Sequence, residues 1–146
     1  MIDSFQDIYA FMSNFHNAPV IYEGVRYANS ESAFQAQKCP ERRHEFINIP
    51  PGIAKKMGRQ CKIRADWEEV KDQIMYEIVF AKFAQNPDIA KKLVETGKEP
   101  IVEGNWWHDN YWGDCKCDRC KNMKGKNMLG KILMVVRHEF ATRDLL

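Results

Sequence analysis

The sequence has 146 residues, of which 45% are hydrophobic and 29% are charged, and its formal net charge is +2. We expect a single domain, residues 1–146, that buries a hydrophobic core. No apolar run approaches the roughly 20 residues that span a bilayer, and the N-terminus lacks a secretion signal, so we expect a cytoplasmic protein with no membrane partner. Basic residues are concentrated in segments 41–64 and 116–131, which could bind phosphates or form ordinary solvated faces.

The first structural signal is a tight β-hairpin. Two β-prone runs within residues 20–27 are joined by a Glu-Gly pair, which favours a two-residue turn. A helix follows at once, because Asn29 or Ser30 can cap its N-terminus, and Pro40 marks its end or a kink.

Four further helices and one strand are predicted along the rest of the chain. One helix follows residues 50–52, a second opens with a capping box at residues 66–69, and a third runs through residues 86–97. A strand-like run at residues 101–103 and a final amphipathic helix complete the pattern. The apolar residues of the first, second and final helices are Ile53, Met57 and Cys61; Val70, Ile74, Ile78 and Ala81; and Met128, Leu129, Ile132, Leu133, Val136 and Phe140. The predicted fold class is therefore α+β, a single compact helix-rich domain with a short N-terminal hairpin.

A row of polar side chains lies on the helix that follows the hairpin. Glu31, Gln35 and Lys38 are spaced at i, i+4 and i+7, so a helix would place them along one face. A carboxylate, an amide and an amine in one row could line a catalytic pocket, or they could form a solvated helix face.

A long loop, residues 104–125, has an unusual content of aromatic residues. It carries four aromatic rings around His108 and Asp109, and loops of this length in compact domains are often functional. Flat rings can stack on a base, while a carboxylate can bind sugar hydroxyls. Each tryptophan could equally pack in the core, but Trp112, which precedes Gly113, is predicted to form a pocket wall.

A cysteine-rich segment, residues 114–124, lies within this loop. Five cysteines without a secretion signal indicate thiols or metal ligands in a reducing compartment. The thiolates of Cys115, Cys117 and Cys120 could bind zinc with a fourth ligand from Cys39, Cys61 or His108, or they could be free loop cysteines. Because a second complete cysteine pair is missing, no metal is included in the predicted site.

Many short motifs, in order along nearly the whole chain, resemble one family, NADAR, also called YbiA-like. Each motif is weak alone, and the specificity comes from their number and order. They are Phe11-Met-Ser-Asn-Phe15, Gly24 to Tyr27, Ser30-Glu31, Gln35, Lys38, Asp66-Trp67, Lys82-Phe83, Asn86, Leu93, Thr96-Gly97, Ile101 to Glu103, Asp109-x-x-Trp112-Gly113, Gly125-x-Asn127-x-x-Gly130, Leu133-Met134 and Arg137.

The resemblance implies an α+β fold without a cofactor domain, and N-glycosidase activity that needs no cofactor. The implied substrate is a ribosylamine or ADP-ribosyl compound: a riboflavin biosynthesis intermediate, or ADP-ribosylated guanine, which DNA or RNA can carry. The pair Trp106-Trp107 is bulkier than the family pattern, and we expect it to narrow the pocket and affect which base is accepted.

Three residues are predicted to be catalytic: Glu31, Lys38 and Asp109. Cleavage of an N-glycosidic bond develops positive charge at the anomeric carbon, which Glu31 could stabilise while directing a water. Its place in the first helical turn favours the charged carboxylate. Lys38 could donate to a ring-opened sugar or attack its aldehyde to form a Schiff base, if burial or a neighbouring charge lowers its pKa. Asp109 could bind ribose hydroxyls or assist departure of the base.

Further residues are predicted to bind the substrate through ring stacking and hydrogen bonds. These are Asn14, Phe15, Gln35, Trp67, Glu103, Trp112, Gly113 and Asn127. The alternative function is a non-catalytic module that binds ADP-ribose or nucleic acid. It would need rings and cations, but no aligned carboxylate and amine.

Overall fold

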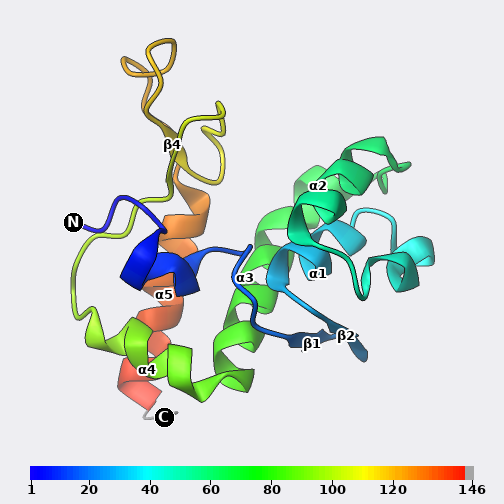
Figure 1. The fold of residues 1–146 in the computed structure, drawn as a ribbon, viewed down its shortest axis with the longest axis horizontal. Helices are drawn as coiled ribbons and strands as arrows, with labels where there is room; N and C mark the ends of the chain where they lie inside the picture. The colour runs from blue at the N-terminus through cyan, green and yellow to red at the C-terminus, as the bar shows by residue number, and fades with distance from the viewer. Residues whose placement is uncertain (144–146) are drawn as a thin grey trace. The chain divides into compact units, whose positions relative to one another are not determined.

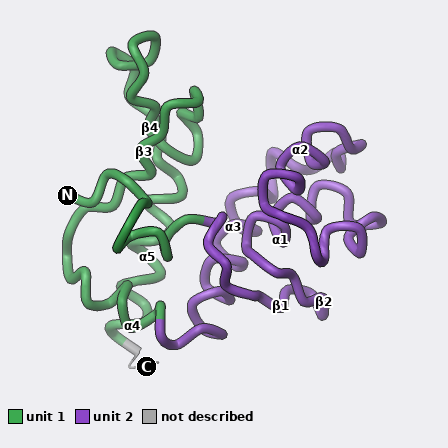
Figure 2. The backbone as a smooth tube through the Cα atoms, in the orientation of Figure 1, with its two compact units in different colours: residues 1–13, 89–146 green, residues 14–88 purple. Residues whose placement is uncertain are grey.

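The computed structural model describes residues 1–143, and it divides into two compact units (Figures 1 and 2). One unit is continuous, Asn14–Asp88. The other joins Met1–Ser13 to the segment that begins at Ile89. The predicted α+β, helix-rich fold with a short hairpin is confirmed, whereas the single domain over residues 1–146 stays a prediction. Among the described residues, no helix is both long and apolar enough to cross a membrane.

The continuous unit begins with the predicted hairpin. Strands β1 (Val20–Tyr22) and β2 (Val25–Tyr27) pair antiparallel, with Val20 opposite Tyr27. The turn residues Glu23 and Gly24 have φ angles of 50° and 77°. Two successive left-handed residues are the requirement of a type I′ turn, whose twist matches that of the strands.

Helix α1 (Ser30–Ala36) follows the hairpin, and all of its residues are buried. It contacts α2 (Pro51–Gln60), α3 (Trp67–Gln85) and the 3₁₀ helix η2 (Pro40–Phe46). The side chain of Asn29 caps its first turn by accepting from the Ser32 N–H at 2.8 Å. The helix ends before Lys38, because the Gln37 side-chain amide donates to the Ala33 carbonyl at 2.9 Å and the Gln37 N–H turns to Phe34 instead.

Helix α2 (Pro51–Gln60) has a different buried face from the predicted one. Its buried residues are Ala54 and Gly58, while Ile53 is 48% exposed and Cys61 lies just after the last turn. Gly58 faces Gln35 of α1, and the lack of a side chain there allows the two helices to approach closely. The four-residue interval beginning at Ile53 therefore did not identify the core side of this helix.

Of the predicted apolar face of helix α3 (Trp67–Gln85), Ile74 and Ile78 are buried, whereas Val70 and Ala81 are half-buried. The predicted capping box is wrong, because the Asp66 side chain makes no capping hydrogen bond. Its carboxylate instead accepts two hydrogen bonds from Arg64, at 2.6 and 3.0 Å. This charge-assisted pair holds the pKa of Asp66 below its usual value.

The discontinuous unit holds most of the remaining elements. Helix α4 (Pro87–Glu95) begins at the end of the first unit, and the chain leaves it through Gly97 at φ 70°, as predicted. The predicted strand at residues 101–103 is reduced to one parallel bridge between Ile101 and Ile2. The other elements are the 3₁₀ helix η1 (Asp7–Met12), strands β3 (Gly104–Asn105) and β4 (Asp114–Cys115), which pair in parallel, and helix α5 (Met128–Arg143).

Candidate functional site

Three of the predicted site residues lie together on α1 and the turn after it. Glu31 and Gln35 are buried, with exposed fractions of 8% and 6%. Lys38 is half-buried in the turn, where its N–H donates to the Gln35 carbonyl at 3.1 Å. The row is therefore not a solvated helix face.

The Lys38 amine lies in a mixed environment of charge and aromatic surface. Burial lowers the pKa of Lys38 below its ordinary value, and the nearby Glu31 carboxylate opposes that shift. The ammonium nitrogen is 5.9 Å from the centre of the Trp67 ring, which itself packs on Phe34 at 5.1 Å between centroids. The pKa of Lys38 is therefore shifted in the direction that a reactive lysine requires.

Gln35 presents a buried acceptor to this group. Among the described residues its Oε1 has no hydrogen-bond partner. The same oxygen lies over Gly58 of α2, where an added Cβ would overlap it and would lie 2.8 Å from Gln35 Cδ. A buried amide oxygen without a donor is costly, and a ligand that donates a hydrogen bond would satisfy it.

Asn14 and Phe15 lie on the segment that leads into the hairpin. The Asn14 Oδ1 accepts from Ser30 Oγ at 2.9 Å, and its carbonyl accepts from the Glu31 N–H at 3.0 Å. These bonds fix the start of α1, so Asn14 positions Glu31 in addition to its predicted ligand contact. Phe15 is 47% exposed, with the Lys55 ammonium 6.0 Å from its ring centre.

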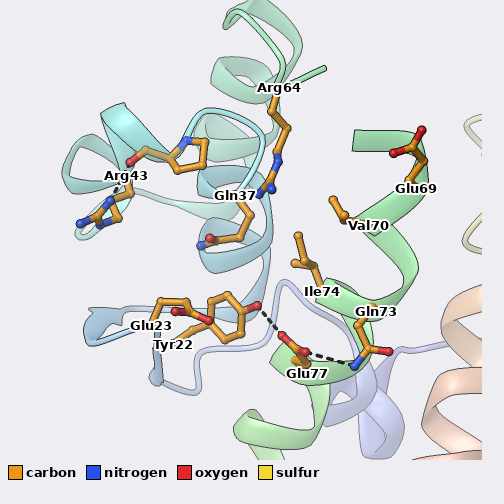
Figure 3. Close-up of a pocket in the computed structure, with 11 residues that line it drawn as sticks. Tyr22, Glu23, Gln37, Arg43, Arg64, Glu69, Val70, Gln73, Ile74 and Glu77 are labelled. Atoms are coloured by element: carbon orange, nitrogen blue, oxygen red, sulfur yellow. Dashed lines mark hydrogen bonds between the residues drawn. The ribbon is translucent and has the colours of Figure 1, made fainter. Parts of the chain in front are cut away.

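A cavity of about 530 Å³ lies elsewhere in the same unit (Figure 3). Among the described residues, its lining includes none of the predicted site residues. Tyr22 donates to Glu77 at 2.6 Å, and burial together with that carboxylate raises the pKa of Tyr22. The lining residues are Tyr22, Glu23, Gln37, Pro40, Arg43, Arg64, Glu69, Val70, Gln73, Ile74 and Glu77.

The loop of the discontinuous unit holds Asp109 in a defined turn. The Asp109 Oδ1 accepts from the backbone N–H groups of Tyr111 and Trp112, at 3.1 and 2.9 Å. Asn105, which is fully buried, donates to the Asp109 carbonyl at 2.7 Å and accepts from its N–H at 3.2 Å. Asn105 is therefore a positioning residue for Asp109.

Glu103, Gly113 and Asn127 form the base of this loop. The Asn127 amide donates to the Ile101 carbonyl at 2.8 Å and accepts from the Glu103 N–H at 2.9 Å. A Cβ at Gly113 would overlap the Glu103 side chain and backbone, so only glycine fits. These contacts give all three residues a bracing role, and their contact with a substrate stays a prediction.

The aromatic residues of the loop differ in exposure. Trp112 is half-buried and meets Tyr111 edge to face, with 4.9 Å between centroids. Trp106 and Trp107 are 65% and 56% exposed. None of these tryptophans is a buried core residue, and whether the exposed pair narrows a pocket stays a prediction.

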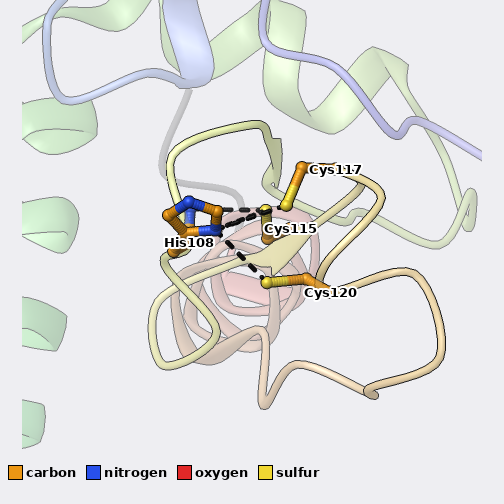
Figure 4. A group of neighbouring side chains, drawn as sticks. All are labelled: His108, Cys115, Cys117 and Cys120. Atoms are coloured by element: carbon orange, nitrogen blue, oxygen red, sulfur yellow. Dashed lines mark hydrogen bonds between the residues drawn. The ribbon is translucent and has the colours of Figure 1, made fainter.

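The cysteines of the loop gather around one imidazole. His108, Cys115, Cys117 and Cys120 have their ligand atoms within 4.8 Å of one another (Figure 4). Of the three residues predicted as a fourth metal ligand, His108 belongs to this group, whereas Cys39 and Cys61 lie in the unit Asn14–Asp88.

Two residues that position the site were not predicted as site residues. Asn105 shows in the sequence only as a polar residue before two tryptophans, and its hydrogen bonds depend on the folded loop. Gly58 carries a weak signal, since a glycine inside a helix often has a packing reason. Neither contact could be located without the three-dimensional structure.

Comparison with known proteins gives a family and a fold. The family model described as NADAR domain matches residues 3–141. N-glycosidase YbiA of Escherichia coli (strain K12) is 36% identical over 105 residues, which cover 68% of this chain and 66% of YbiA, just under two thirds of its length. A riboflavin biosynthesis protein of Vibrio vulnificus (strain YJ016) is 32% identical over 100 residues, covering 65% of this chain and 27% of that protein.

A solved structure agrees with these matches. The NMR structure of the E. coli protein YbiA is similar with a TM-score of 0.81 and 35% identity, over 99% of this chain and 89% of that one. The predicted resemblance to the NADAR family is confirmed by the family model and by this structure, which covers nearly the whole chain. Since the family model spans nearly all of the sequence and relatives named N-glycosidases share both sequence and fold, this chain belongs to the NADAR domain family.

Proposed function

We propose that this chain is an N-glycosidase that hydrolyses the bond between a ribose carbon and a nitrogen of a base-like group. The observation that carries the proposal is the grouping of the buried Glu31 and Gln35 with the half-buried Lys38, whose amine lies beside the Trp67 ring. A module that only binds nucleotides has no need of a buried carboxylate next to a half-buried amine. The names of the relatives support the reaction class.

Glu31 is assigned the stabilisation of the transition state. As the C–N bond breaks, positive charge develops at the anomeric carbon, and a fixed carboxylate in a site shielded from water stabilises it. The carboxylate can also accept a proton from the attacking water. Water adds to the sugar carbon, the nitrogen leaves with a proton, and the products are the free sugar and the amine. The hydrogen bonds that Asn14 accepts from Ser30 Oγ and from the Glu31 N–H support this role by fixing the start of α1.

Lys38 is assigned a contact with the sugar. Its lowered pKa increases the fraction of neutral amine at a given pH, and only the neutral amine attacks an aldehyde. In its charged form it donates hydrogen bonds to sugar or phosphate oxygens. Borohydride added during turnover would reduce a Schiff base on Lys38 to a stable adduct. If no adduct forms, only the hydrogen-bonding role of Lys38 is left.

Gln35 and Trp67 are assigned to substrate binding. The unpartnered Gln35 Oε1 would accept from a sugar hydroxyl or a base N–H. Trp67 is 8% exposed and packs on Phe34, so its proposed stacking contact with a base would use only the edge that stays accessible. Asp109 stays a predicted catalytic residue. Because its Oδ1 already accepts two backbone N–H groups, Oδ2 is the oxygen proposed to contact a ligand.

The proposed substrates are two kinds of glycosylamine. A ribosylamine intermediate of riboflavin biosynthesis is supported by the relative named for that pathway. An ADP-ribosylated guanine, carried on DNA or RNA, contains the same type of bond and is the second candidate. We place the reaction in the cytoplasm, because none of the five cysteines is in a disulfide, as is usual in a reducing compartment.

The test is release of sugar from each substrate by the purified chain. The ribosylamine intermediate and an ADP-ribosylated DNA oligonucleotide are incubated separately, and the freed sugar or ADP-ribose is measured by mass spectrometry. Glu31→Gln is expected to lower kcat by at least about 100-fold while leaving the Kd for substrate largely unchanged. The matched control is Glu41→Gln, because Glu41 is an exposed carboxylate in the same unit.

Two results would overturn the proposal. Unchanged turnover in Glu31→Gln would refute the role of this carboxylate. Tight binding of ADP-ribose without cleavage of either substrate by the wild-type chain would favour the alternative, a non-catalytic binding module.

A further inference from the structure

The strongest feature outside the proposed catalytic group is the cysteine and histidine cluster of the long loop. The Nδ1 of His108 lies 3.3 Å from Cys117 Sγ, 3.4 Å from Cys120 Sγ and 3.9 Å from Cys115 Sγ (Figure 4). One imidazole nitrogen therefore faces three sulfurs at once. We propose that these four side chains bind one zinc ion as a structural site.

The distances suit a tetrahedral zinc ion. With Zn–N about 2.0–2.1 Å and Zn–S about 2.3 Å, tetrahedral angles place nitrogen and sulfur about 3.6 Å apart and two sulfurs about 3.8 Å apart. The observed nitrogen–sulfur distances, 3.3–3.9 Å, bracket the first value. All four ligand atoms lie within 4.8 Å of one another, so small movements would complete the geometry.

The backbone brings the ligands together from two separate stretches of the loop, one at His108 and the other at residues 115–120. His108 has a left-handed backbone conformation, with a φ of 70°, and its N–H donates to Cys115 Sγ at 3.3 Å. The Cys120 N–H donates to the Cys117 carbonyl at 3.0 Å, closing a turn between the last two ligands. Asn110 Oδ1 accepts from the Cys115 N–H at 2.8 Å and orients that ligand. The surrounding hydrogen bonds thus support the ligands as metal sites require.

The kind of metal follows from the donor set. Three sulfurs and one nitrogen favour zinc over magnesium or calcium, which prefer oxygen ligands. Cys115 and Cys120 are buried, whereas His108 is exposed and Cys117 is partly so, which gives an ion a route from solvent. Four protein ligands leave no position for a reactive water, so the site would hold the loop rather than perform chemistry.

The site would stabilise the segment that carries Asp109. Residues 108 and 120 are the first and last ligands, and β4 lies between them. The four ligands are brought together only in the folded loop, so the free energy of metal binding adds to the free energy of folding. This inference concerns the metal and does not depend on the proposed glycosidase activity.

The experiment measures metal rather than turnover. The full chain, purified without chelator, is expected to contain about one zinc per chain by elemental mass spectrometry. Cys117→Ser and His108→Ala are expected to lose most of it and to unfold at lower temperature. Cys61→Ser is the matched control, because it removes a half-buried cysteine of the other unit and should keep the zinc.

Cobalt provides a second measurement that does not require the variants to fold. Wild-type chain stripped of metal and given Co²⁺ should show thiolate-to-cobalt charge-transfer absorption and the visible bands of tetrahedral cobalt. Substoichiometric zinc together with no such absorption would overturn the proposal. The proposal would also be overturned if the chain, exposed to air, lost the mass of two hydrogens and then took up no metal. That result would identify a redox disulfide between two of the cysteines instead.

Discussion

Replacing Gly58 with alanine tests the contact between α2 and the candidate site. The added methyl group would overlap Gln35 Oε1 and lie 2.8 Å from Cδ and 3.4 Å from Cβ of the same side chain. Gln35 is buried, so its amide has little room to rotate away. The substitution should therefore disturb both the packing of α2 on α1 and the orientation of a proposed ligand-binding group.

The magnitude follows from two opposing effects. Overpacking a buried contact costs about 1–3 kcal/mol of unfolding free energy. Alanine in a helix interior gains about 1 kcal/mol relative to glycine. The net expectation is a loss of about 0–2 kcal/mol.

Gly52 offers the matched control, because it lies in the first turn of the same helix with open space around it. Gly52→Ala should be neutral or stabilising by up to about 1 kcal/mol. Urea unfolding of both variants gives the comparison, and a kcat/KM measurement on a cleaved glycosylamine reports the orientation of Gln35. If Gly58→Ala is as stable as Gly52→Ala and equally active, the proposed packing of Gln35 against α2 is incorrect.

Three further predictions concern buried groups. Burial lowers the pKa of Lys82 to about 7 in the folded chain. Between pH 7 and about 10.4 the unfolded chain therefore binds more protons at this lysine than the folded chain does. The free energy of unfolding should then rise with pH across that range, by up to about 1.4 kcal/mol per pH unit. Lys82→Met should remove that contribution, and equal pH slopes of the two proteins in urea unfolding would contradict it. Asn105→Ala leaves the Trp107 and Asp109 N–H groups without their acceptor and should cost about 2–4 kcal/mol in urea unfolding; a loss below about 0.5 kcal/mol would show that the loop does not depend on this amide. Gly113→Ala should cost at least about 1–3 kcal/mol, since the methyl group meets rigid backbone of Glu103, and unchanged thermal stability would refute that packing.

The elements that the sequence could predict are those with short-range causes. The hairpin depends on two adjacent left-handed residues, and the limits of α4 depend on Pro87 and Gly97. Such signals need only neighbouring residues, so they can be read without knowledge of the fold. Glu31 and Gln35 were predictable on one helix for the same reason, whereas their burial and the end of α1 before Lys38 were not.

The features that could not be predicted depend on partners elsewhere in the chain. Asp66 has the sequence context of a helix cap, but Arg64 competes for its carboxylate more strongly than the helix amides do. The end of α1 depends on one side chain, Gln37, bonding back to Ala33. The fourth residue of the cysteine cluster had three candidates, and only the loop geometry selects His108. Side-chain competition of this kind has no periodic signature.

The division of the chain has a consequence for the order of events during synthesis. The first thirteen residues belong to the same unit as the segment beginning at Ile89, and Ile2 forms its bridge with Ile101, about 100 positions later. Residues 14–88 can therefore form their internal contacts during synthesis, before the segment that contacts residues 1–13 has been made. A chain that ends before residue 101 would lack the backbone partner of Ile2, a residue that is buried in the fold.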